Sequence, residues 1–596
     1  MWRQRLTDAT AAAAGRTGAV FEAINPRTRP ITVDGARVDT PDGPQWRTDG
    51  DSIRQSAAKL CASTVALTAG CLKRGTYLSP EERAAGRLDD HFQAPELANV
   101  RAALQQRKAP IEFDELVLPW TESRLAEAVK NCDDSAPGPS GLTYWMMGKA
   151  TESWRSTLAL MMNSFQERGY CPPPLRHGYV YPIPKLGEGG STFEGARQIV
   201  LLEVVLKLIS GGIAERAMAI WESRGDIHAS QHGFRKGRYA GLVASFVTAL
   251  HDLYRRQGKP LYTVALDLTK AFQSVGLPAI EGALRRMGVP ERAIALWMQT
   301  DFGEWLPPAH QGDLWAASYG TCQVITGAGL SPDFPTQTGV RQGERASAIK
   351  FLVWIELLWA FLDLEGVVGA PVDLDNPEGE RVAFLGFADD IWAASDNFEE
   401  LQRTVTLIDR FMAAFDVELS PKKSLVAITS PGPRDAHRAI SIRREVAGKE
   451  VLLPLQRVEH HDSYRYLGIM LQPDGRWQAM ESVVLNKVRA WTTKVRQVSL
   501  PVDQAVMVLR SVVGGLLNYV LTAAPLSEVC MRKIDKMVAA AVFSCAGLAR
   551  GRRTTWAFLP LREGGFGATS AQTLRRAVVL EKVLSWLNGQ AYQHAD

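Results

Sequence analysis

Two apolar runs near the middle of the chain end in acidic residues. Residues 261–266 (Leu-Tyr-Thr-Val-Ala-Leu) are rich in strand-forming side chains, and Asp267 follows them directly. A second run, 382–388, leads into Asp389–Asp390, and a further apolar run, 391–394, comes next. Short uninterrupted apolar runs of this kind predict buried β-strands. We therefore predict a strand that carries Asp267 at its end, and a β-hairpin whose two-residue turn is the acidic pair.

The pattern around these strands is mostly helical. Helices and loops alternate over 115–260, and a long apolar run from Ala346 to Glu365, stopped by Gly366, predicts a core helix. The Pro/Gly-rich stretch 303–338 predicts an irregular excursion. The last 120 residues show helical periodicity throughout.

Composition and charge narrow the class of protein. The chain has 596 residues, of which 46% are hydrophobic and 22% charged, and these globular values exclude a disordered, collagen-like or coiled-coil chain. The net charge is +4, but residues 476–596 contain 16 lysines and arginines against seven acids and carry +9. A basic C-terminal region suits a polyanionic partner. A merely solvated helical face is the alternative, and charge alone does not separate the two.

Cysteine usage and hydropathy indicate an intracellular protein. The seven cysteines are scattered without a CxxC pair, which argues against a zinc site and against a secreted disulfide framework. We find no secretory signal. The longest uncharged stretch, Ser511–Ser527, is 17 residues long and contains two glycines, so a buried helix is favoured over a membrane span, which needs about 20 residues. We expect a location in the nucleus or the cytoplasm.

The acidic strand ends suggest a metal site. Adjacent carboxylates in apolar surroundings are costly without a counter-charge, which a divalent cation supplies. Two metal ions about 3.5–4 Å apart, held by carboxylates, catalyse in-line phosphoryl transfer. A solvated turn is the ordinary explanation of an Asp-Asp pair taken alone. The apolar strands on both sides and the separate strand that ends at Asp267 favour the metal site.

Nine segments, in a fixed order over about residues 115–475, resemble those of the non-LTR (LINE-type) retrotransposon reverse transcriptases. In chain order they are Pro137–Gly141, the fingers motifs Tyr181–Lys185 and Arg197–Ile199, the QHGFRKG segment Gln231–Gly237, motif A Leu266–Phe272, motif B Gly339–Gly343 followed by Ser347, motif C Phe387–Asp390, motif D Leu419–Ser424, and Tyr466–Gly468. Each segment alone is a weak signal. Their shared order is a strong one.

The resemblance implies an α+β fold, that of a right-hand polymerase. Residues 1–114 would be a leader of unknown role, and 115–475 the fingers and the palm, with the motif-bearing core at about 166–473 and the palm starting at 261. The palm would be an antiparallel sheet backed by helices. Residues 476–596 would form a basic α-helical thumb. The implied activity is that of an RNA-directed DNA polymerase, a nucleotidyltransferase that uses an RNA template, a DNA primer and deoxynucleoside triphosphates, with two Mg²⁺ ions and Mn²⁺ as the alternative.

The same resemblance assigns roles to individual residues. The carboxylates Asp267, Asp389 and Asp390 would hold both metal ions. The remaining candidates are Lys185 and Arg197 for the triphosphate, Phe272 as a steric gate against a 2′-hydroxyl, Gln342 and Gly343 along the nascent base pair, and Lys423 as proton donor to the leaving pyrophosphate. Solvated charge is the alternative for the basic residues, and core packing for the phenylalanine.

Some positions depart from the family pattern. Gln273 replaces the acid that usually ends motif A, residues 342–348 of motif B lack both usual prolines and gain charge, and Gln198 replaces a fingers proline. No metal ligand is lost, but fidelity and template grip are put in doubt. The chain also lacks the endonuclease segments that many such elements carry, so we expect that activity from another chain or from a missing segment.

Three alternatives remain open. An RNA-dependent RNA polymerase usually carries Gly-Asp-Asp in motif C and a second acid in motif A. A catalytically silent, domesticated nucleic-acid-binding protein would accommodate the changes in motif B, although all three acids are intact. A maturase-like intron protein fits the Phe-Ala form of motif C and the QHGFRKG segment less well.

Overall fold

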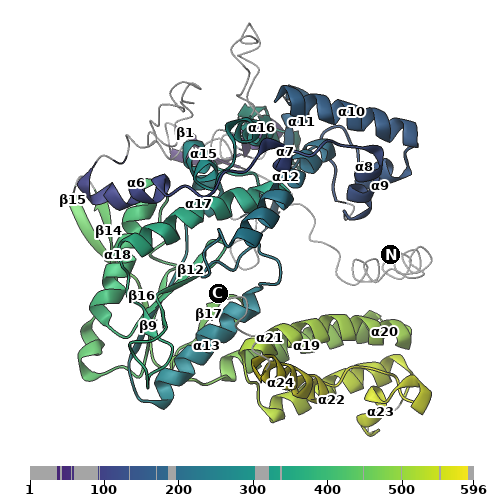
Figure 1. Cartoon of the computed structure of the whole chain (residues 1–596). Helices are drawn as coiled ribbons and strands as arrows, with labels where there is room; N and C mark the ends of the chain where they lie inside the picture. The colour runs from purple at the N-terminus through teal and green to yellow at the C-terminus, as the bar shows by residue number, and fades with distance from the viewer. Residues whose placement is uncertain are drawn as a thin grey trace.

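The structure is a computed structural model with a mixed α+β fold (Figure 1). It describes residues 36–40, 43–47, 49–55, 57–58, 92, 94–132, 135–169, 171–184, 196–302, 321–335, 339–446, 449–498, 500–548 and 552–587. Lys185 and the Gly-rich loop that follows it therefore lie outside the described residues, as does 303–320.

A five-stranded sheet forms the centre of the fold. Its strands, in spatial order, are β11 (Phe384–Phe387), β12 (Asp390–Ser395), β5 (Leu261–Leu266), β13 (Leu425–Thr429) and β16 (Gln456–Val458). All neighbours are antiparallel except the edge pair β13 and β16. The predicted strands are confirmed, and the hairpin pairs directly with the strand that ends at Asp267.

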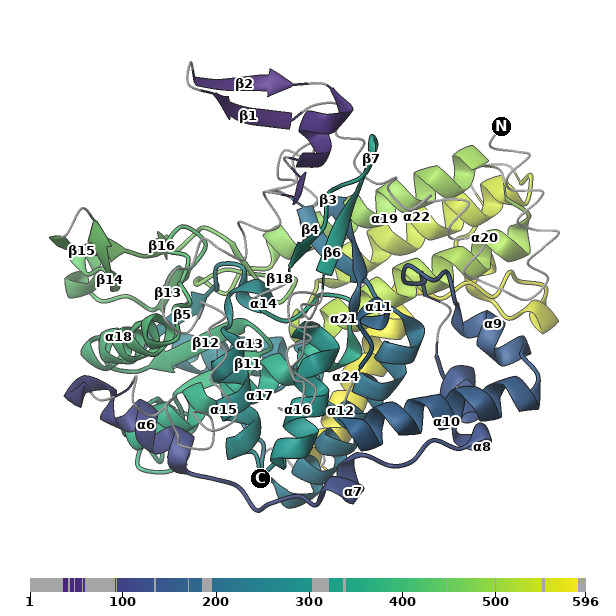
Figure 2. The same ribbon diagram turned by 90° about the horizontal axis from the view of Figure 1, so that it is seen from above.

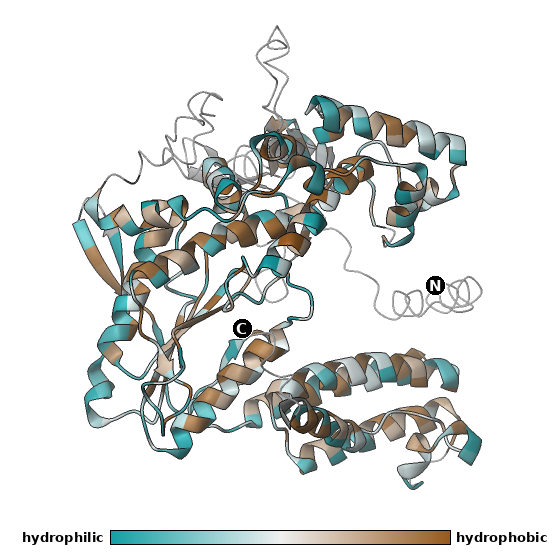
Figure 3. Cartoon of the chain, viewed as in Figure 1, coloured by the Kyte–Doolittle hydropathy of each residue, from teal (hydrophilic) through white to brown (hydrophobic). Residues whose placement is uncertain are grey.

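Helices cover one face of this sheet and bury the main core. The central helix α17 (Arg345–Leu364) is buried along nearly its whole length, because it packs between the sheet and further helices. The predicted helix from Ala346 to Glu365 is confirmed to within one residue at each end. Figure 3 shows hydrophobic residues concentrated along α17 and on inward-facing surfaces of its neighbours. The other helices in this core include α15 (Leu277–Arg286), α18 (Phe398–Ala414) and α6 (Ala98–Gln105).

Part of the expected leader belongs to this core. The Phe92 ring lies 5.2 Å from the Phe415 ring, measured between centroids. Residues of α6 pack with α17, and the backbone N–H groups of Lys108 and Ile111 donate to carbonyls at the end of α15 and just after it. Residues 92–111 are thus a strap across the central helices.

A second sheet lies beside the first (Figure 2). Its strands are β4 (Ala196–Leu201), β3 (Gly178–Pro184), β6 (Thr321–Thr326), β7 (Gly329–Leu330) and β8 (Phe334–Pro335). The prediction of an irregular excursion is wrong for 321–335, because β6 pairs with β3 in parallel, β7 and β8 pair with β6 in antiparallel orientation, and residues of β6 and β8 belong to a small core at this sheet. A local Pro/Gly count does not detect a strand whose partner is about 140 residues earlier in the chain.

Among the described residues between 112 and 260, the regular elements are helices apart from β3 and β4. These helices are α7 (Phe113–Leu116), α8 (Glu122–Lys130), α9 (Tyr144–Lys149), α10 (Glu152–Arg168), α11 (Pro173–Arg176), α12 (Val204–Arg224) and α13 (Ala240–Arg256), and α14 (Ala271–Ser274) and α16 (Glu291–Phe302) follow β5. Three of the seven begin at a threonine whose side chain accepts a hydrogen bond from the first turn, as N-caps do.

The C-terminal region is a helical bundle whose core is shared with α13 and with strands of the central sheet. It contains α19 (Gln478–Val498), α20 (Val502–Leu509), a π-helical turn at Arg510–Gly514, α21 (Gly515–Ala523), α22 (Glu528–Cys545), α23 (Thr555–Phe558) and α24 (Ala571–Leu587). Helical periodicity is confirmed here. The stretch Val502–Ala523 is long and apolar enough to cross a membrane by composition alone, but many of its residues are buried in the bundle core.

Four two-stranded hairpins complete the described structure. They are β1 (Ala36–Thr40) with β2 (Gly43–Arg47), β9 (Ala370–Pro371) with β10 (Arg381–Val382), β14 (Ser441–Val446) with β15 (Lys449–Pro454), and β17 (Tyr464–Tyr466) with β18 (Ile469–Leu471). The β17–β18 hairpin lies in the same core as α13 and the C-terminal bundle, so it connects the bundle to the central sheet.

Candidate catalytic site at the edge of the central sheet

The strand register brings the predicted acids together. Ile391 of β12 pairs with Leu266 of β5 in antiparallel register, so Asp390 comes opposite Asp267 one residue further along. Side chains directly opposite on antiparallel strands have Cβ atoms about 4.5–5.5 Å apart and share a face. Asp389 lies in the adjoining turn. Two acids that are more than 120 residues apart in the sequence therefore end at the same edge of the sheet.

The hairpin turn is displaced by one residue from its predicted position. Phe387 pairs with Asp390, so the two turn residues are Ala388 and Asp389, and Asp390 already belongs to β12. The prediction of an Asp389–Asp390 turn is wrong for this reason. Ala388 has φ of +59°, a left-handed conformation that a residue with a Cβ adopts only at a cost. Hairpin turns with positive φ at the first position usually have glycine there.

Electrostatics at this edge disfavour the ionised carboxylates. Burial, and then the charges of the neighbouring Asp389 and Asp267, raise the pKa of Asp390 to about 7. Burial followed by the charge of Asp267 also raises the pKa of Asp389. Arg465 of β17 acts in the opposite direction on Asp390. The three acids thus repel one another in a partly buried place, where a cation would relieve the repulsion.

The QHGFRKG segment supports the hairpin from behind. Gln231 is fully buried, and its Oε1 accepts hydrogen bonds from the backbone N–H of Gly233 (2.7 Å) and of Ala388 (3.2 Å). The N–H of His232 donates to the Gly386 carbonyl, and the Gly386 N–H donates to the Ser230 carbonyl. A Cβ on Gly233 would lie 2.2 Å from the Ala388 nitrogen, so only glycine allows this approach.

Motif D holds the end of β5. The backbone N–H of Asp267 donates to the buried Ser424 hydroxyl (3.2 Å), and the N–H of Ser420 donates to the Asp267 carbonyl (2.8 Å). Lys423, the predicted proton donor, lies exposed in this same turn. Motif D therefore fixes the backbone of Asp267 and carries an exposed lysine next to it.

The predicted gate, Phe272, lies between two aromatic rings. It stacks on Phe351 of α17 with a centroid distance of 4.7 Å, and it meets the edge of Phe234 at 6.3 Å. Phe351 is fully buried, whereas Phe234 is 43% exposed and has φ of +60°. Phe272 is itself only partly buried. One ring face is thus supported by the core.

Motif B contacts the second sheet. The carbonyl of Gln342 accepts from the N–H of Val200 (2.6 Å), and Gly343, with φ of +120°, lies against the Val200 carbonyl, where a Cβ would be 2.4 Å from the oxygen. Arg197 is exposed on the same strand, β4. The structure therefore brings Gln342 and Gly343 to the strand that carries Arg197, while Lys185 lies outside the described residues.

The charge that distinguishes motif B here is compensated inside the protein. Glu344 and Lys350 have fully buried side chains, with the Glu344 Oε2 3.9 Å from the Lys350 Nζ. Ser210 and Ser347 also donate hydrogen bonds to the Glu344 carboxylate, and the Lys350 Nζ donates to the Trp297 carbonyl (3.0 Å). A buried charge is tolerated when it is paired and hydrogen-bonded. The unusual Glu344 is therefore part of a complete internal network.

Sequence reasoning assigned no role to two contributors to this site. Gln231 was part of a recognised segment, but the sequence did not show that its amide bonds the acidic hairpin. Arg465 lies two residues before Leu467, whose carbonyl accepts a hydrogen bond from the Tyr519 hydroxyl of α21. Its charge reaches Asp390 only because β17 folds against the central sheet. No local signal marks either residue, since both act through long-range contacts.

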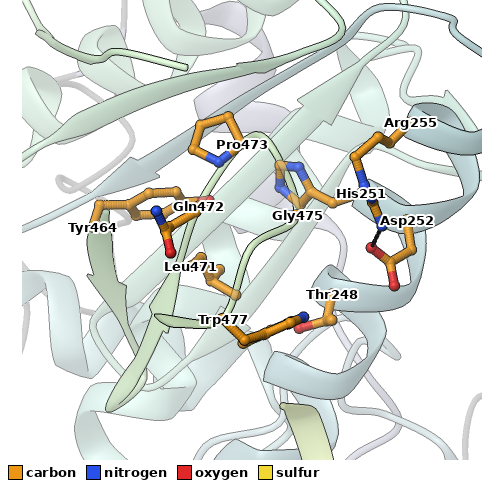
Figure 4. Close-up of a pocket in the computed structure, with 10 residues that line it drawn as sticks. All are labelled: Thr248, His251, Asp252, Arg255, Tyr464, Leu471, Gln472, Pro473, Gly475 and Trp477. Atoms are coloured by element: carbon orange, nitrogen blue, oxygen red, sulfur yellow. Dashed lines mark hydrogen bonds and ion pairs between the residues drawn. The ribbon is translucent and has the colours of Figure 1, made fainter. Parts of the chain in front are cut away.

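A small cavity between α13 and the β17–β18 hairpin contains none of the predicted site residues (Figure 4). Its volume is about 20 Å³, close to that of one water molecule. His251 faces it, with its Nδ1 2.6 Å from the Thr429 hydroxyl, and burial lowers the pKa of His251 to about 4. This cavity is a feature of the junction with the C-terminal bundle, not a substrate pocket.

The three acids have the chemistry of a divalent-cation site without a preformed cage. Carboxylate oxygens are the ligands that Mg²⁺ prefers, and the mutual repulsion described above would be relieved by a cation. Within the described part of the chain, no group of three or more histidine, cysteine, aspartate or glutamate side chains is already arranged to enclose a metal ion. The donor set fits, and the enclosing geometry would form with the substrate phosphates.

Comparison with known proteins identifies the domain. Residues 183–471 match the family "Reverse transcriptase (RNA-dependent DNA polymerase)". The chain is 26% identical over 485 residues to a Pol polyprotein from the R2 retrotransposable element of Popillia japonica, covering 78% of this chain and 60% of that protein. It is 23% identical to the R2 protein of Nasonia vitripennis, over 76% of this chain and 41% of the relative.

The R2DM protein of Drosophila melanogaster is 23% identical over 73% of this chain and 38% of its own length. The chain thus spans between about two fifths and three fifths of the length of these relatives. The matched family segment contains all three acids, Phe272 and both motif B candidates. This chain carries a reverse transcriptase domain, and over most of its length it is a distant homologue of the Pol proteins of R2 non-LTR retrotransposons.

Proposed function

We propose that the chain is an RNA-directed DNA polymerase of a LINE-type element, which adds deoxynucleotides to a DNA 3′-hydroxyl on an RNA template. The observation that carries this proposal is the strand register that sets Asp390 opposite Asp267, with Asp389 in the adjoining turn, inside a reverse transcriptase domain. Reverse transcriptases typically use divalent metal ions, and these acids are the donors that such ions require.

The proposed architecture is a right-hand polymerase. The palm would be the central sheet with its helices within 261–475, the fingers the region 115–260, and the thumb the bundle 476–596. The strands at 321–335 would join the fingers sheet although they lie within the palm segment of the sequence. The strap at 92–111 supports the palm core, which gives part of the leader a structural role.

In the proposed mechanism the chain positions the reactants around the acidic edge. Asp267, Asp389 and Asp390 would hold two Mg²⁺ ions, which activate the primer 3′-hydroxyl and stabilise charge on the phosphates when bound. Arg197 and Lys185 would bind the triphosphate, since basic side chains form charge-assisted hydrogen bonds with phosphate oxygens. Lys423 would donate a proton to the leaving pyrophosphate from its exposed place beside Asp267.

The residues that line the site would select the incoming nucleotide. Phe272 would exclude a 2′-hydroxyl because its ring is backed by the fully buried Phe351 and cannot retreat. Gln342 and Gly343 would line the nascent base pair, where the absence of a side chain on the glycine permits close approach. RNA template, DNA primer and deoxynucleoside triphosphates are thus the proposed partners, in an intracellular setting, with strand nicking supplied by another chain or segment.

A catalytically silent binder is the second candidate, and the changes in motif B favoured it. The buried network around Glu344 shows that this change in motif B is accommodated within the fold, so it does not by itself indicate a loss of activity. An RNA-dependent RNA polymerase is the third candidate. The Phe272 gate speaks against it.

The deciding experiment is primer extension with purified protein on an RNA template. Asp389→Asn should abolish extension in magnesium while melting stays unchanged, because an amide cannot balance the charge of the metal ions. Asp462→Asn removes an exposed carboxylate from the loop before β17 and should extend normally. Near-normal extension by Asp389→Asn would refute the catalytic assignment, and incorporation of ribonucleotides by the unmodified protein would favour the RNA polymerase.

A further inference from the structure

A second cavity, lined by basic side chains, lies between α8, α12 and the first residue of α17. Its volume is about 260 Å³, and its lining includes Arg124, Lys207, Arg216 and Arg345. Glu215 is the one acid in that lining. None of these residues belongs to the acidic edge of the sheet. The cavity therefore has a strong excess of positive charge and no role in the proposed chemistry.

The protein holds these cations in place from behind. Arg124 stacks 4.2 Å above the Trp120 ring and donates to the carbonyls of Leu118 and Pro119. Lys207 is only 6% exposed, and its Nζ has a carbonyl partner, Ala136, at 3.4 Å. Such restraint reduces the side-chain entropy that would be lost when a ligand binds.

The cations at the cavity repel one another, and two nearby acids, Glu203 and Glu215, act against this repulsion. Burial lowers the pKa of Lys207, the charge of Glu203 raises it and the charge of Arg345 lowers it. Burial and then the charge of Arg216 lower the pKa of Arg124, which Glu215 raises. Glu215 pairs with Arg345 at 3.3 Å, but its side chain is 71% exposed. An anion placed among these groups would relieve the repulsion.

Two adjacent glycines keep the cavity open. Gly211 and Gly212 lie within the helix α12, where glycine is less favourable than alanine. A Cβ on Gly212 would lie 3.5 Å from the Arg124 guanidinium, and a Cβ on Gly211 would lie 3.3 Å from the Arg345 side chain. Larger side chains at these positions would enter the space in front of the basic groups.

The cavity adjoins the proposed base-pair site. Arg345 follows Gly343 by two residues, and Gly343 lies against β4. A template strand that leaves the nascent base pair at Gly343 on the uncopied side would pass the start of α17, where Arg345 is half exposed. A triphosphate, in contrast, would be bound from the β4 side by Arg197.

We propose that this basic cavity binds a backbone phosphate of the RNA template, on the single-stranded stretch that has not yet been copied. The inference rests on the proposed function, since it assumes a template at motif B. A phosphate suits the site because guanidinium groups bind it through paired hydrogen bonds and the cavity has room for a nucleotide unit.

The test compares binding to two primer–template duplexes, one blunt and one with a long 5′ RNA overhang, using the full chain and fluorescence anisotropy. The unmodified protein should bind the overhang duplex more tightly than the blunt one, and the ratio of the two Kd values is the overhang gain. Arg345→Gln should remove most of that gain, roughly tenfold in Kd, and lower the salt slope by about 0.7. Gly212→Leu should give the same loss by filling the cavity, and Glu215→Gln should tighten overhang binding.

The matched control is Arg168→Gln, which removes one exposed positive charge from the end of α10 outside the cavity and should leave the overhang gain intact. Melting curves report on folding, and Arg345→Gln, at a half-exposed side chain, remains informative if Gly212→Leu does not fold. An undiminished overhang gain in Arg345→Gln overturns the proposal. So does a higher KM for deoxynucleotides with an unchanged overhang gain, which would mark a triphosphate site.

Failure of the proposed function would look different. Binding to the overhang requires no catalysis, so a protein that binds overhangs through the cavity but never extends a primer would refute the polymerase and keep the cavity assignment. If the protein extends primers but its overhang gain does not depend on Arg345, Gly212 or Glu215, the polymerase is kept and the cavity assignment is refuted.

Discussion

At the residue scale, Phe272 owes its expected selectivity to the rings around it. Phe351 backs one face and is fully buried, so Phe272 cannot move away from a larger sugar. Overpacking of a close-packed site costs about 1–3 kcal/mol, which corresponds to roughly tenfold to hundredfold discrimination. An aromatic gate without this support would discriminate less.

We predict that Phe272→Val admits ribonucleotides and changes deoxynucleotide use much less. The measurement is the ratio of kcat/KM for the two sugars in each variant, since discrimination lies in that ratio. Phe361→Val is the matched control, because this ring is buried on the same helix as Phe351. An unchanged ratio in Phe272→Val would leave this residue with core packing alone.

His251 provides a pH-dependent contribution to stability. Burial lowers its pKa to about 4, below the value of about 6.5 expected in the unfolded chain. The unfolded state therefore binds the proton more readily, so the stabilisation is present above about pH 6.5 and is lost as the pH falls toward 4. The full effect is on the order of 3–4 kcal/mol, at about 1.4 kcal/mol per pKa unit.

We predict that His251→Gln flattens the fall in melting temperature between about pH 7 and pH 4. His437→Gln, at an exposed position, should leave the fall unchanged. Parallel curves for His251→Gln and the unmodified protein would show that this imidazole does not titrate in that range.

At the element scale, the acidic hairpin depends on the segment Gln231–Gly237 behind it. A left-handed alanine at 388 is unfavourable by itself, and the hydrogen bond from its N–H to Gln231 stabilises the conformation. Close approach at Gly233 and the backbone bonds at Gly386 fix the same turn. The position of Asp389 is thus set by residues more than 150 positions earlier in the chain.

We predict that Gln231→Leu lowers kcat at least tenfold while primer–template affinity stays within about twofold. Losing the amide oxygen leaves two buried N–H groups without this acceptor, at about 1–3 kcal/mol. Gln402→Leu removes a comparable pair of hydrogen bonds, to Ser441, away from the hairpin, so it should lower stability without a selective loss of kcat. Equal effects of both variants on kcat would reduce Gln231 to a general structural role.

At the scale of the whole molecule, the C-terminal bundle is not an independent appendage. Its core is continuous with α13 and with the β17–β18 hairpin, and the Tyr519 hydroxyl bonds the Leu467 carbonyl. Deleting 476–596 would therefore expose apolar surface of the central region. Its basic charge is better tested by substitutions at exposed positions. Figure 1 draws α19 on the side of the bundle that faces α8–α10, and α22 on the other.

We predict that neutralising Lys487, Arg489 and Arg496 on α19 weakens template–primer binding and lowers its salt slope by about 2, at about 0.7–0.9 per phosphate contact. Neutralising Arg532, Lys533 and Lys536 on α22 removes the same charge from exposed positions and should change the slope little. Equal slopes in both triple variants would mean that α19 does not contact nucleic acid.

The sequence by itself determined the strands, the central helix and the identity of the acids. These features are local. An apolar run that ends in an acid predicts a buried strand and the end at which the carboxylate lies, whichever strand it pairs with. The order of the motif segments also predicted a reverse transcriptase domain, which the comparison with known proteins confirms. The catalytic and metal-binding roles of Asp267, Asp389 and Asp390 stay predictions. So do the roles of the other candidates, which are Lys185, Arg197, Phe272, Gln342, Gly343 and Lys423.

The tertiary structure decided what depends on contacts between distant residues. The turn moved to Ala388–Asp389 because Gln231 and Gly233 stabilise a left-handed alanine there, and no turn propensity of Ala-Asp foretells it. Residues 321–326 form a strand because they pair in parallel with the edge of β3. Glu344 is an unusual acid in the sequence of motif B, and only the fold shows that Lys350 pairs with it and that Ser210 donates a hydrogen bond to it. In each case the free energy comes from a partner far away along the chain, where local sequence patterns carry no information.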